Sequence, residues 1–222
     1  MFQALLDDNG AAADNRRNGA REPDAAGGGA PAAIGDIVRL GGVDWRVIFL
    51  ADERKLVISE HVLERRAYHS PGGIVTWADS TLRAHLNGQF LDGFSEAERG
   101  RILETSIGTA NNPWFGSSGG EATLDRVFIL SLEETVMIFG DSEQLWNRHH
   151  HGNVGGIISD QYNGARIATE PDGTVRFSVW LRSPGYNNSF AAYIGSSGGI
   201  SVVGYGVNFA NGGVRPAMWL SR

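Results

Sequence analysis

The residues best suited to chemistry lie in one stretch near the end of the chain, Tyr186 to Asn211. It contains no Asp, Glu, Lys or Arg, although a chain that is 20% charged would place about five charges there. The stretch is rich in Tyr, Ser, Gly and Asn, with Phe added. Tyr offers a large amphipathic contact area at low entropic cost, and Ser, Gly and Asn offer adaptable hydrogen bonds. This composition predicts a surface that binds a ligand.

The two segments that flank this stretch differ from it in kind. Trp-Leu-Arg-Ser-Pro-Gly precedes it at 180–185, and Gly-Gly-Val-Arg-Pro-Ala-Met-Trp-Leu follows it at 212–220. Each flank holds a Trp, an Arg and a Pro, a set that suits buried anchors and fixed turns. We expect the flanks to hold the backbone of the central stretch.

Two other patterns suggest catalysis or metal binding, but neither has the context that such chemistry needs. Gly-x-Ser-x-Gly occurs at 116–120 and 195–199. A nucleophile elbow needs a strand before the Ser and a helix after it, and the sequence predicts neither context. The run His149-His150-His151 falls in a predicted loop, where three adjacent imidazoles rarely reach one metal ion. A solvated loop is the favoured interpretation.

The remaining titratable residues point to structure. His61, His69 and His85 stand alone in the sequence. The pairs Glu53/Glu64 and Glu133/Glu134 have the residue types of an acid and a base. The second pair begins a predicted helix, however, where carboxylates stabilise the macrodipole. We predict no catalytic residue, no metal site and no cofactor, and therefore a protein that is not an enzyme.

The composition limits the partners. The chain has 222 residues and a formal net charge of −6, which argues against a non-specific grip on nucleic acid. It has no Cys, so disulfides, thiolate metal sites and Cys nucleophiles are excluded. No apolar run approaches the roughly 20 residues of a membrane helix, and the N-terminus does not resemble a signal peptide. We expect no membrane insertion, and a location in the cytoplasm, on a virion or on a cell surface.

The pattern of apolar residues predicts an α+β fold. Residues 1–33, rich in Ala, Gly and Asp, are expected to form a flexible tail, and residues 34–222 to form one domain. Three strands open this domain: 37–40 and 45–50 around Gly41-Gly42, and then 55–59. A further strand is expected at 177–181, and the apolar run 127–130 is expected to be a strand that leads into a helix.

Capping signals place the helices. Asp79 or Ser80 is the expected N-cap of a helix that reaches Asn87. Capping boxes are predicted where Ser95 precedes Glu98 by three residues and where Ser131 precedes Glu134. Of the six Trp, four are expected in the core: Trp45, Trp77, Trp180 and Trp219. Trp114, in the Gly/Asn-rich loop 111–120, is expected to be exposed as a fixed contact beside the binding surface.

The two flanks and the central stretch between them are similar to the C-terminal pattern of variable proteins from diversity-generating retroelements. Upstream blocks also resemble a related bacterial and phage domain family of otherwise unknown function. These blocks are Trp-Arg-Val at 45–47, Thr-Trp-Ala-Asp-Ser-Thr-Leu-Arg at 76–83 with Leu86-Asn87, and Phe-Ile-Leu-Ser at 128–131. The resemblance covers about residues 34–222. It implies a C-type-lectin-like fold in which Trp180, Arg182, Arg215 and Trp219 serve the scaffold.

In that family, a reverse transcriptase introduces substitutions at the adenines of a template copy of the gene segment, chiefly in the Asn codons AAC and AAT. If only the first two codon bases vary, Lys, Glu, Gln, Met and Trp are not accessible, and none occurs in the central stretch. The resemblance implies a variable region at about 186–211 with fixed scaffold positions at Ala191, Ala192, Ile194, Gly198, Ile200, Gly204 and Val207. It implies ligand-binding positions at Tyr186, Asn187, Asn188, Ser189, Phe190, Tyr193, Gly195, Ser196, Ser197, Gly199, Ser201, Val202, Val203, Tyr205, Gly206, Asn208, Phe209, Ala210 and Asn211.

The resulting hypothesis is a variable receptor or adhesin whose C-terminal face binds a protein or glycan. The aromatic residues of the set are the expected anchors, because aromatic side chains dominate binding hot spots. The chain lacks the Glu-Pro-Asn or Gln-Pro-Asp loop of calcium-dependent lectins, and 146–148 reads Trp-Asn-Arg rather than Trp-Asn-Asp. No calcium-dependent sugar site is therefore expected. The alternatives are a structural phage tail or virion protein and an enzyme related to formylglycine-generating enzymes, whose chemistry needs the Cys that this chain lacks.

Overall fold

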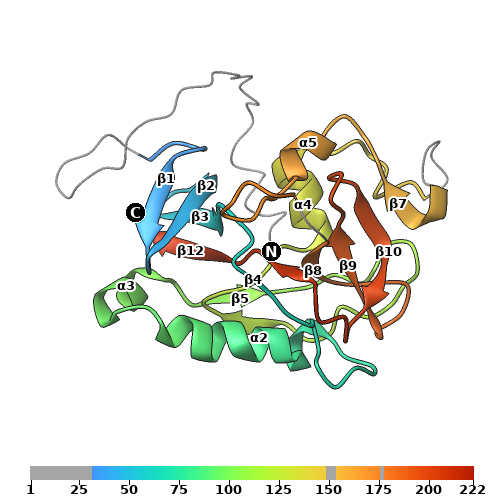
Figure 1. Cartoon of the computed structure of the whole chain (residues 1–222), viewed down its shortest axis with the longest axis horizontal. Helices are drawn as coiled ribbons and strands as arrows, with labels where there is room; N and C mark the ends of the chain where they lie inside the picture. The colour runs from blue at the N-terminus through green and yellow to red at the C-terminus, as the bar shows by residue number, and fades with distance from the viewer. Residues whose placement is uncertain (1–31, 149–153, 176–177) are drawn as a thin grey trace.

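A computed structural model describes residues 32–148, 154–175 and 178–222, which form an α+β fold of mostly antiparallel sheets and short helices (Figure 1). The fold class predicted from the sequence is confirmed at this level. Residues 1–31 of the predicted tail lie outside the described residues. In the part of the chain that the structure describes, no helix is long and apolar enough to cross a bilayer.

The first sheet has four antiparallel strands in the order β1-β2-β3-β12. The predicted hairpin is present, with β1 and β2 joined by Gly41-Gly42, and the predicted third strand follows as β3. The last strand of the chain, β12, adds to β3, so that Trp219 lies opposite Leu56 (Figure 1). The strands are β1 (Ile37–Leu40), β2 (Val43–Ala51), β3 (Arg54–Ser59) and β12 (Ala217–Ser221).

The second sheet has six strands in the order β4-β11-β8-β9-β10-β7 and lies on the other side of the molecule (Figure 1). Its neighbours are antiparallel except β11 and β8. Residue 177, where a strand was expected to begin, lies outside the described residues, and β8 begins at Val179. The strands are β4 (Glu64–Arg65), β7 (Ile157–Ile158), β8 (Val179–Pro184), β9 (Phe190–Ile194), β10 (Ile200–Gly206) and β11 (Gly213–Val214).

A two-stranded sheet and several short helices surround these sheets. The small sheet pairs β5 (Thr105–Ile107) with β6 (Thr123–Asp125). Figure 1 shows α2 and α3 along the lower side and α4 and α5 at the upper side. The helices are η1 (Trp77–Asp79), α2 (Thr81–His85), η2 (Leu86–Phe90), α3 (Glu96–Arg101), α4 (Leu132–Phe139), η3 (Val154–Gly156) and α5 (Asn163–Arg166).

The helix starts agree with the predicted caps. The Ser80 side chain accepts a hydrogen bond from the backbone N–H of Arg83 at the start of α2. Both capping boxes form, at Ser95 for α3 and at Ser131 for α4. Each box satisfies backbone N–H groups that have no partner within their helix.

One predicted strand is wrong. Residues 127–130 are buried, but their only β-pairing is an isolated bridge from Phe128 to Ala217. The segment passes through the core between the sheets, where its backbone also bonds to side chains and to β8. A run of apolar residues reports burial, and burial alone does not distinguish a strand from an extended core segment.

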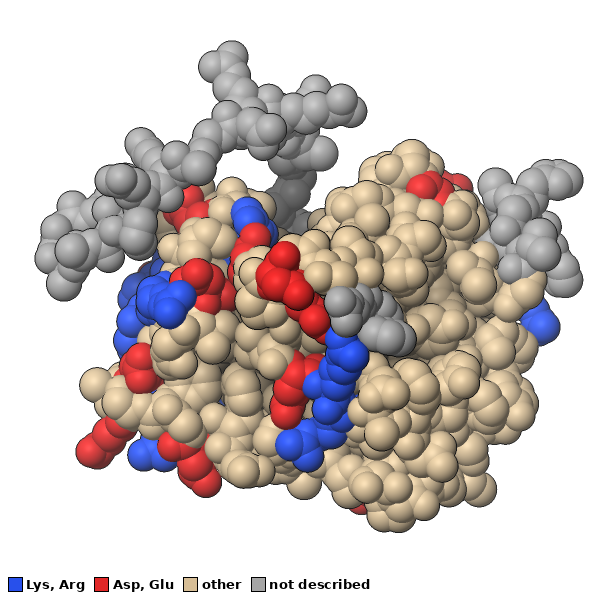
Figure 2. Space-filling view, viewed as in Figure 1, with Lys and Arg blue, Asp and Glu red and all other residues tan. Residues whose placement is uncertain are grey.

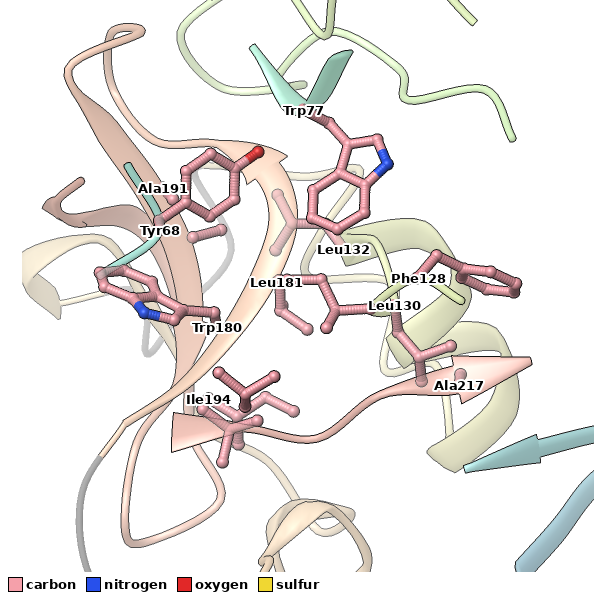
Figure 3. Packing of buried hydrophobic residues seen from close by; sticks show 14 of the residues in the cluster. Tyr68, Trp77, Phe128, Leu130, Leu132, Trp180, Leu181, Ala191, Ile194 and Ala217 are labelled. Atoms are coloured by element: carbon pink, nitrogen blue, oxygen red, sulfur yellow. The ribbon is translucent and has the colours of Figure 1, made fainter. Parts of the chain in front are cut away.

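The core contains buried residues of both large sheets, and the ring of Tyr68 packs within it (Figure 3). The ring of Tyr68 lies 6.0 Å from that of Trp180 and 6.1 Å from that of Trp77. Its hydroxyl donates to the carbonyl of Arg182 at 2.9 Å, and burial raises the pKa of Tyr68 above its usual value. The four Trp expected in the core are all buried.

Candidate ligand-binding face

The stretch from Tyr186 to Asn211 forms β9, β10 and the turns around them. Between the two strands, the N–H of Gly195 donates to the carbonyl of Gly199 at 2.8 Å. Gly198 has φ +82°, and a Cβ there would lie 1.9 Å from the carbonyl oxygen of Asn163 at the start of α5. Only Gly fits this backbone and this close approach, so the turn is fixed against α5.

The expected scaffold positions lie on the inner side of this hairpin. Ala191, Ala192, Ile194, Gly198, Ile200 and Val207 are buried, and Gly204 is half-buried. The burial of these positions is what a scaffold role requires. It also explains why substitution here would cost stability while substitution on the outer side would not.

Most of the expected ligand-binding positions reach the surface. Seven are exposed: Tyr186, Ser196, Ser197, Tyr205, Asn208, Ala210 and Asn211. Nine are half-buried: Asn187, Asn188, Ser189, Phe190, Tyr193, Gly195, Val203, Gly206 and Phe209. We call these sixteen residues the candidate face.

Three expected ligand-binding positions are buried, which corrects the sequence interpretation. Val202 is fully buried, and the hydroxyl of Ser201 accepts a hydrogen bond from the N–H of Gly204 at 3.1 Å. Gly199 packs against Ile157 and Ile158, the two residues of β7. β7 pairs with the start of β10 at Ile200 and Ser201, and Asn112 bonds to the carbonyl of Val202. The three buried positions belong to the support of the face and not to its contact surface.

The five expected anchors form two groups of touching rings. The rings of Tyr186 and Phe190 have centroids 4.5 Å apart. The ring of Tyr205 lies 4.8 Å from that of Phe209 and 6.4 Å from that of Tyr193. Tyr186 and Tyr205 remain 44% and 51% exposed. Mutual packing limits the motion of the rings while leaving their outer parts available to a partner.

The backbone beneath the face is irregular, and one side chain fills the irregularity. The register shifts in β10 between Ser201 and Tyr205, and in β8 between Trp180 and Pro184. The buried Asn112 reaches this place from the loop 109–120. Its Nδ2 donates to the carbonyls of Pro184 and Val202 at 2.8 and 2.9 Å, so two ladder groups that the bulge frees are satisfied.

The same loop makes two further bonds to the face. The hydroxyl of Ser117 donates to the carbonyl of Gly185 at 2.5 Å, and Nδ2 of Asn188 donates to the carbonyl of Ser118 at 2.7 Å. The sequence interpretation missed Asn112 and this support. The only signal in the sequence is an Asn before a Pro in a loop rich in Gly and Asn.

The aromatic contact expected from this loop is a different residue. Trp114 is buried, with its indole N–H donating to the carbonyl of Leu145 at 2.8 Å, so its predicted exposure is wrong. Its neighbour Phe115 lies 6.4 Å from the ring of Tyr186, with the guanidinium of Arg148 over its other side at 4.5 Å. Phe115 therefore extends the first aromatic group, and Arg148 marks its edge.

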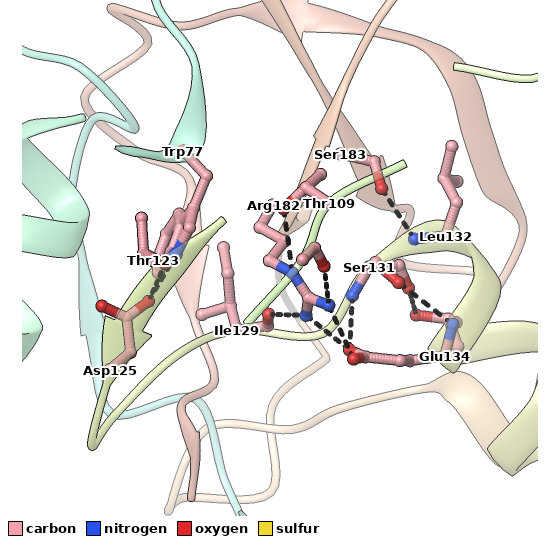
Figure 4. A network of polar contacts seen from close by, with 12 residues as sticks. Trp77, Thr109, Thr123, Asp125, Ile129, Ser131, Leu132, Glu134, Arg182 and Ser183 are labelled. Carbon is pink, nitrogen blue, oxygen red and sulfur yellow. Dashed lines mark hydrogen bonds and ion pairs between the residues drawn. The ribbon is translucent and has the colours of Figure 1, made fainter. Parts of the chain in front are cut away.

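The first flank is held by a buried ion pair (Figure 4). Arg182 in β8 contacts both carboxylate oxygens of Glu134 at 2.5 and 2.6 Å. It also donates to the carbonyls of Ile129 and Gly108 at 2.8 and 3.0 Å and to the hydroxyl of Thr109 at 3.1 Å. Glu134 accepts in turn from the N–H of Ser131, as the capping box of α4 requires. One guanidinium thus joins β8 to the start of α4 and to Gly108 and Thr109 at the beginning of the loop 109–120.

The second flank is equally buried. The Nε of Arg215 donates to the carbonyl of Ser59 at 2.8 Å. Trp219 is 1% exposed and packs edge-on against Phe49 with centroids 6.1 Å apart. Both flanks therefore lie where a scaffold role places them.

Charge is distributed unevenly over the surface (Figure 2). Lys, Arg, Asp and Glu gather over the four-stranded sheet and the middle of the molecule, while the side that holds β9 and β10 is almost uniformly uncharged. No charged residue occurs between Tyr186 and Asn211. A partner of this face would be recognised through shape, apolar contact and neutral hydrogen bonds.

The patterns that suggested hydrolysis lack the required geometry. The Gly-x-Ser-x-Gly at 195–199 is the turn between β9 and β10, and the copy at 116–120 lies in an irregular loop. Neither is followed by a helix, as a nucleophile elbow needs. Residues 149–151, the adjacent His, lie outside the described residues. Elsewhere in the described ranges, no group of three or more His, Asp or Glu could hold a metal ion.

The lone His residues have structural contacts. His85 lies 2.7 Å from Glu64, and His61 lies 3.1 Å from the hydroxyl of Thr169. Glu134 is committed to Arg182, and burial beside Glu134 raises the pKa of Glu133. Glu64 lies on β4, whereas Glu53 is in the turn before β3, so these two carboxylates sit on separate sheets. Neither Glu53 with Glu64 nor Glu133 with Glu134 therefore forms the acid and base pair that the sequence suggested.

A second buried ion pair fixes the loops around α5 and predicts an acid-sensitive step. Burial alone opposes ionisation of Asp160, but hydrogen bonds from Arg166, Ser142 and the N–H of Tyr162 outweigh it and lower the pKa of Asp160. A carboxylate with a lowered pKa in the folded state stabilises the fold above its unfolded pKa, roughly 3.9. That contribution is lost as the pH falls through the lower, folded pKa.

We expect Asp160→Asn to reduce the free energy of unfolding at pH 7 by about 1–3 kcal/mol, because Arg166 would lose its charged partner. Urea denaturation at pH 7 and pH 3 measures the change. The difference in the free energy of unfolding between the variant and the unmodified protein should be smaller at pH 3, where the carboxyl group begins to lose its charge. The control is Asp92→Asn, at an exposed residue, and its free energy of unfolding should equal that of the unmodified protein at both pH values. The prediction would be contradicted if Asp160→Asn lowered the free energy of unfolding by the same amount at both pH values.

Comparison with known proteins identifies a family. The family described as a domain of unknown function, DUF6273, matches residues 52–222. The match spans β3 to β12 and includes both flanks, the loop 109–120 and the whole candidate face. No curated protein and no solved structure shows a significant match to the chain.

Proposed function

The chain belongs to the DUF6273 family, whose description assigns no function, and we propose a function from the structure of the site. The candidate face binds a protein or glycan partner. The observation that carries this proposal is the continuous set of uncharged, partly exposed residues on β9, β10 and their turns. Its two aromatic groups rest on a fixed backbone, as the anchors of a recognition surface do. The proposed role is that of a receptor or adhesin rather than an enzyme.

We propose further that the face is diversified by a retroelement on a C-type-lectin-like scaffold. Two features support this extension. Expected scaffold positions lie inside and most expected variable positions lie outside, so substitutions would change the surface without changing the core. The flanks are tied to the core through Arg182 and Arg215, which keeps the backbone independent of the outward side chains.

The genetic test of this extension is direct. We expect the gene to lie beside a reverse transcriptase gene and a near-copy of the codons for residues 180–217, with mismatches at adenines of that copy. Sequencing the neighbourhood on both sides of the gene provides the measurement. A neighbourhood with neither feature would remove the proposal of diversification and leave that of binding.

The binding test uses the second aromatic group. We expect Tyr193→Ala combined with Tyr205→Ala to weaken binding by about a thousandfold, because truncating two hot-spot residues costs about 2 kcal/mol each. Thermal unfolding should change little, since Tyr205 is exposed and Tyr193 half-buried. The probe is a protein or glycan that an array of surface proteins and glycans shows to bind the unmodified chain. Surface plasmon resonance then compares the dissociation constants.

The matched control is Ile74→Ala, which removes a side chain that is 86% exposed and outside the face. It should leave the dissociation constant unchanged. Equal affinity of the double variant and the control would overturn the proposal. Self-association of the unmodified chain that the double variant abolishes would instead favour a structural role in which the face packs between copies.

A further inference from the structure

A small cavity behind the candidate face is lined by two buried Arg residues. Its volume is about 10 Å³, and its walls come from both large sheets, from α4 and from the segment at the end of α5. The charged residues in the lining are Arg166 and Arg215. The other lining side chains are apolar, among them Phe139, Trp180 and Ile194.

Arg166 has an N–H group with no partner. The side chain is 0% exposed. Its terminal nitrogens bond to Asp160 at 2.8 and 3.1 Å and to the carbonyl of Gly140 at 2.7 Å. Its Nε is buried and has no hydrogen-bond partner among the described residues. A buried donor left unsatisfied costs free energy, and a bound acceptor would remove that cost.

Arg215 carries a charge with no carboxylate partner within ion-pair distance in the described ranges. Its Nε bonds to the carbonyl of Ser59 at 2.8 Å, and Nη2 contacts the carbonyl of Glu60 at 3.4 Å. The carboxylate of Glu60 is held by Arg46. Burial lowers the pKa of Arg215, because a guanidinium taken out of water is stabilised less. An anion next to it would offset this loss of hydration.

We propose that this cavity binds a single halide ion, chloride under ordinary conditions, through Arg166 and Arg215. A buried water needs acceptors as well as donors, about three partners in all. The lining side chains offer only donors, since a guanidinium has no acceptor and the indole N–H of Trp180 is committed to the carbonyl of Arg66 at 2.8 Å. A halide needs donors alone.

The size of the cavity favours a monatomic anion. A volume of about 10 Å³ is close to the room that one water-sized particle occupies. A halide is nearer to this size than a carboxylate, a phosphate or a sugar. Because β8 and β9 form part of the wall, the ion would brace the strands that carry the candidate face from behind. This inference does not depend on what the face binds.

The first test is thermal unfolding of the unmodified full chain in sodium chloride, sodium bromide or sodium gluconate at equal ionic strength. Gluconate is too large for the cavity. We expect Tm to rise by about 2–4 °C in chloride or bromide, and the rise to saturate with concentration. Equal Tm values in the three salts would overturn the proposal.

The second test locates the ion. Arg215→Met should abolish the halide-dependent shift in Tm, whereas Arg39→Met, at an exposed surface pair, should retain it. If Arg215→Met does not fold, Ala168→Val adds two methyl groups at the wall of the cavity and should abolish the shift while leaving both guanidiniums in place. Crystals soaked in sodium bromide should show an anomalous peak between Arg166 and Arg215. Water alone at that position would overturn the proposal.

Discussion

Replacing Arg182 with Met is expected to lower the free energy of unfolding by about 3–5 kcal/mol, because the substitution leaves the buried carboxylate of Glu134 without its counter-charge. Arg182 and Glu134 are 3% and 5% exposed at their side chains. The carbonyls of Ile129 and Gly108 would lose a donor as well. Urea denaturation followed by tryptophan fluorescence measures the loss.

The matched control is Arg39→Met, which breaks an ion pair of similar length at the surface. Arg39 and Asp44 lie 2.7 Å apart, but their side chains are 61% and 45% exposed. Water screens such a pair, so its loss should cost about 1 kcal/mol or less. A double variant, Arg182→Met with Glu134→Leu, should recover part of the stability by removing the orphaned charge. A loss for Arg182→Met no larger than that of the control would contradict the role given to this pair.

The position of this ion pair is compatible with the proposal that the outer side of the hairpin varies while the fold stays stable. Arg182 lies in β8, directly before the stretch that forms the candidate face. Its contacts run inward, to α4 and to the segment 108–109, and none of them reaches an outward side chain of β9 or β10. Changes on the outer side of the hairpin therefore leave these contacts unaltered. The contacts that stabilise the fold and the proposed recognition surface would thus lie on opposite sides of the same strands.

Local patterns in the sequence predicted much of this fold. The hairpin at Gly41-Gly42 and the capping boxes at Ser95 and Ser131 depend on residues within a few positions of each other. The burial of the flanking Trp and Arg follows from their type and from the turns beside them. The division of 186–211 into scaffold and surface positions came instead from the family resemblance, and it misplaced Gly199, Ser201 and Val202, which are buried.

Features that depend on distant partners were not predictable. Trp114 and Trp146 have similar polar surroundings in the sequence, yet Trp114 is 8% exposed and Trp146 is 57% exposed. The difference arises because the indole of Trp114 meets Leu145, 31 positions away. Ser201 is buried where β10 pairs with β7, which lies more than forty positions earlier in the chain. A single sequence does not show which distant strands pair with each other in a sheet.

Gly212→Ala is expected to lower the free energy of unfolding by about 2–4 kcal/mol, because the new methyl group has no room. A Cβ on Gly212 would lie 2.0 Å from the indole nitrogen of Trp180. Trp180 is 1% exposed, and its N–H donates to the carbonyl of Arg66, so the ring has no space to withdraw. Urea denaturation gives the loss, and near-ultraviolet circular dichroism should report a changed environment of the indole.

The control is the same substitution at an open position. Gly100 lies in the last turn of α3, is exposed, and has no atom within 4 Å of an added Cβ. Gly100→Ala should raise the free energy of unfolding by about 0.5–1 kcal/mol, because Ala is the better helix former. The two variants add one identical methyl group and should change stability in opposite directions. If only Gly212→Ala lowers the free energy of unfolding, the loss is due to the contact with Trp180. If Gly212→Ala leaves the free energy of unfolding unchanged, the close packing of Gly212 in the second flank against Trp180 in the first flank is wrong.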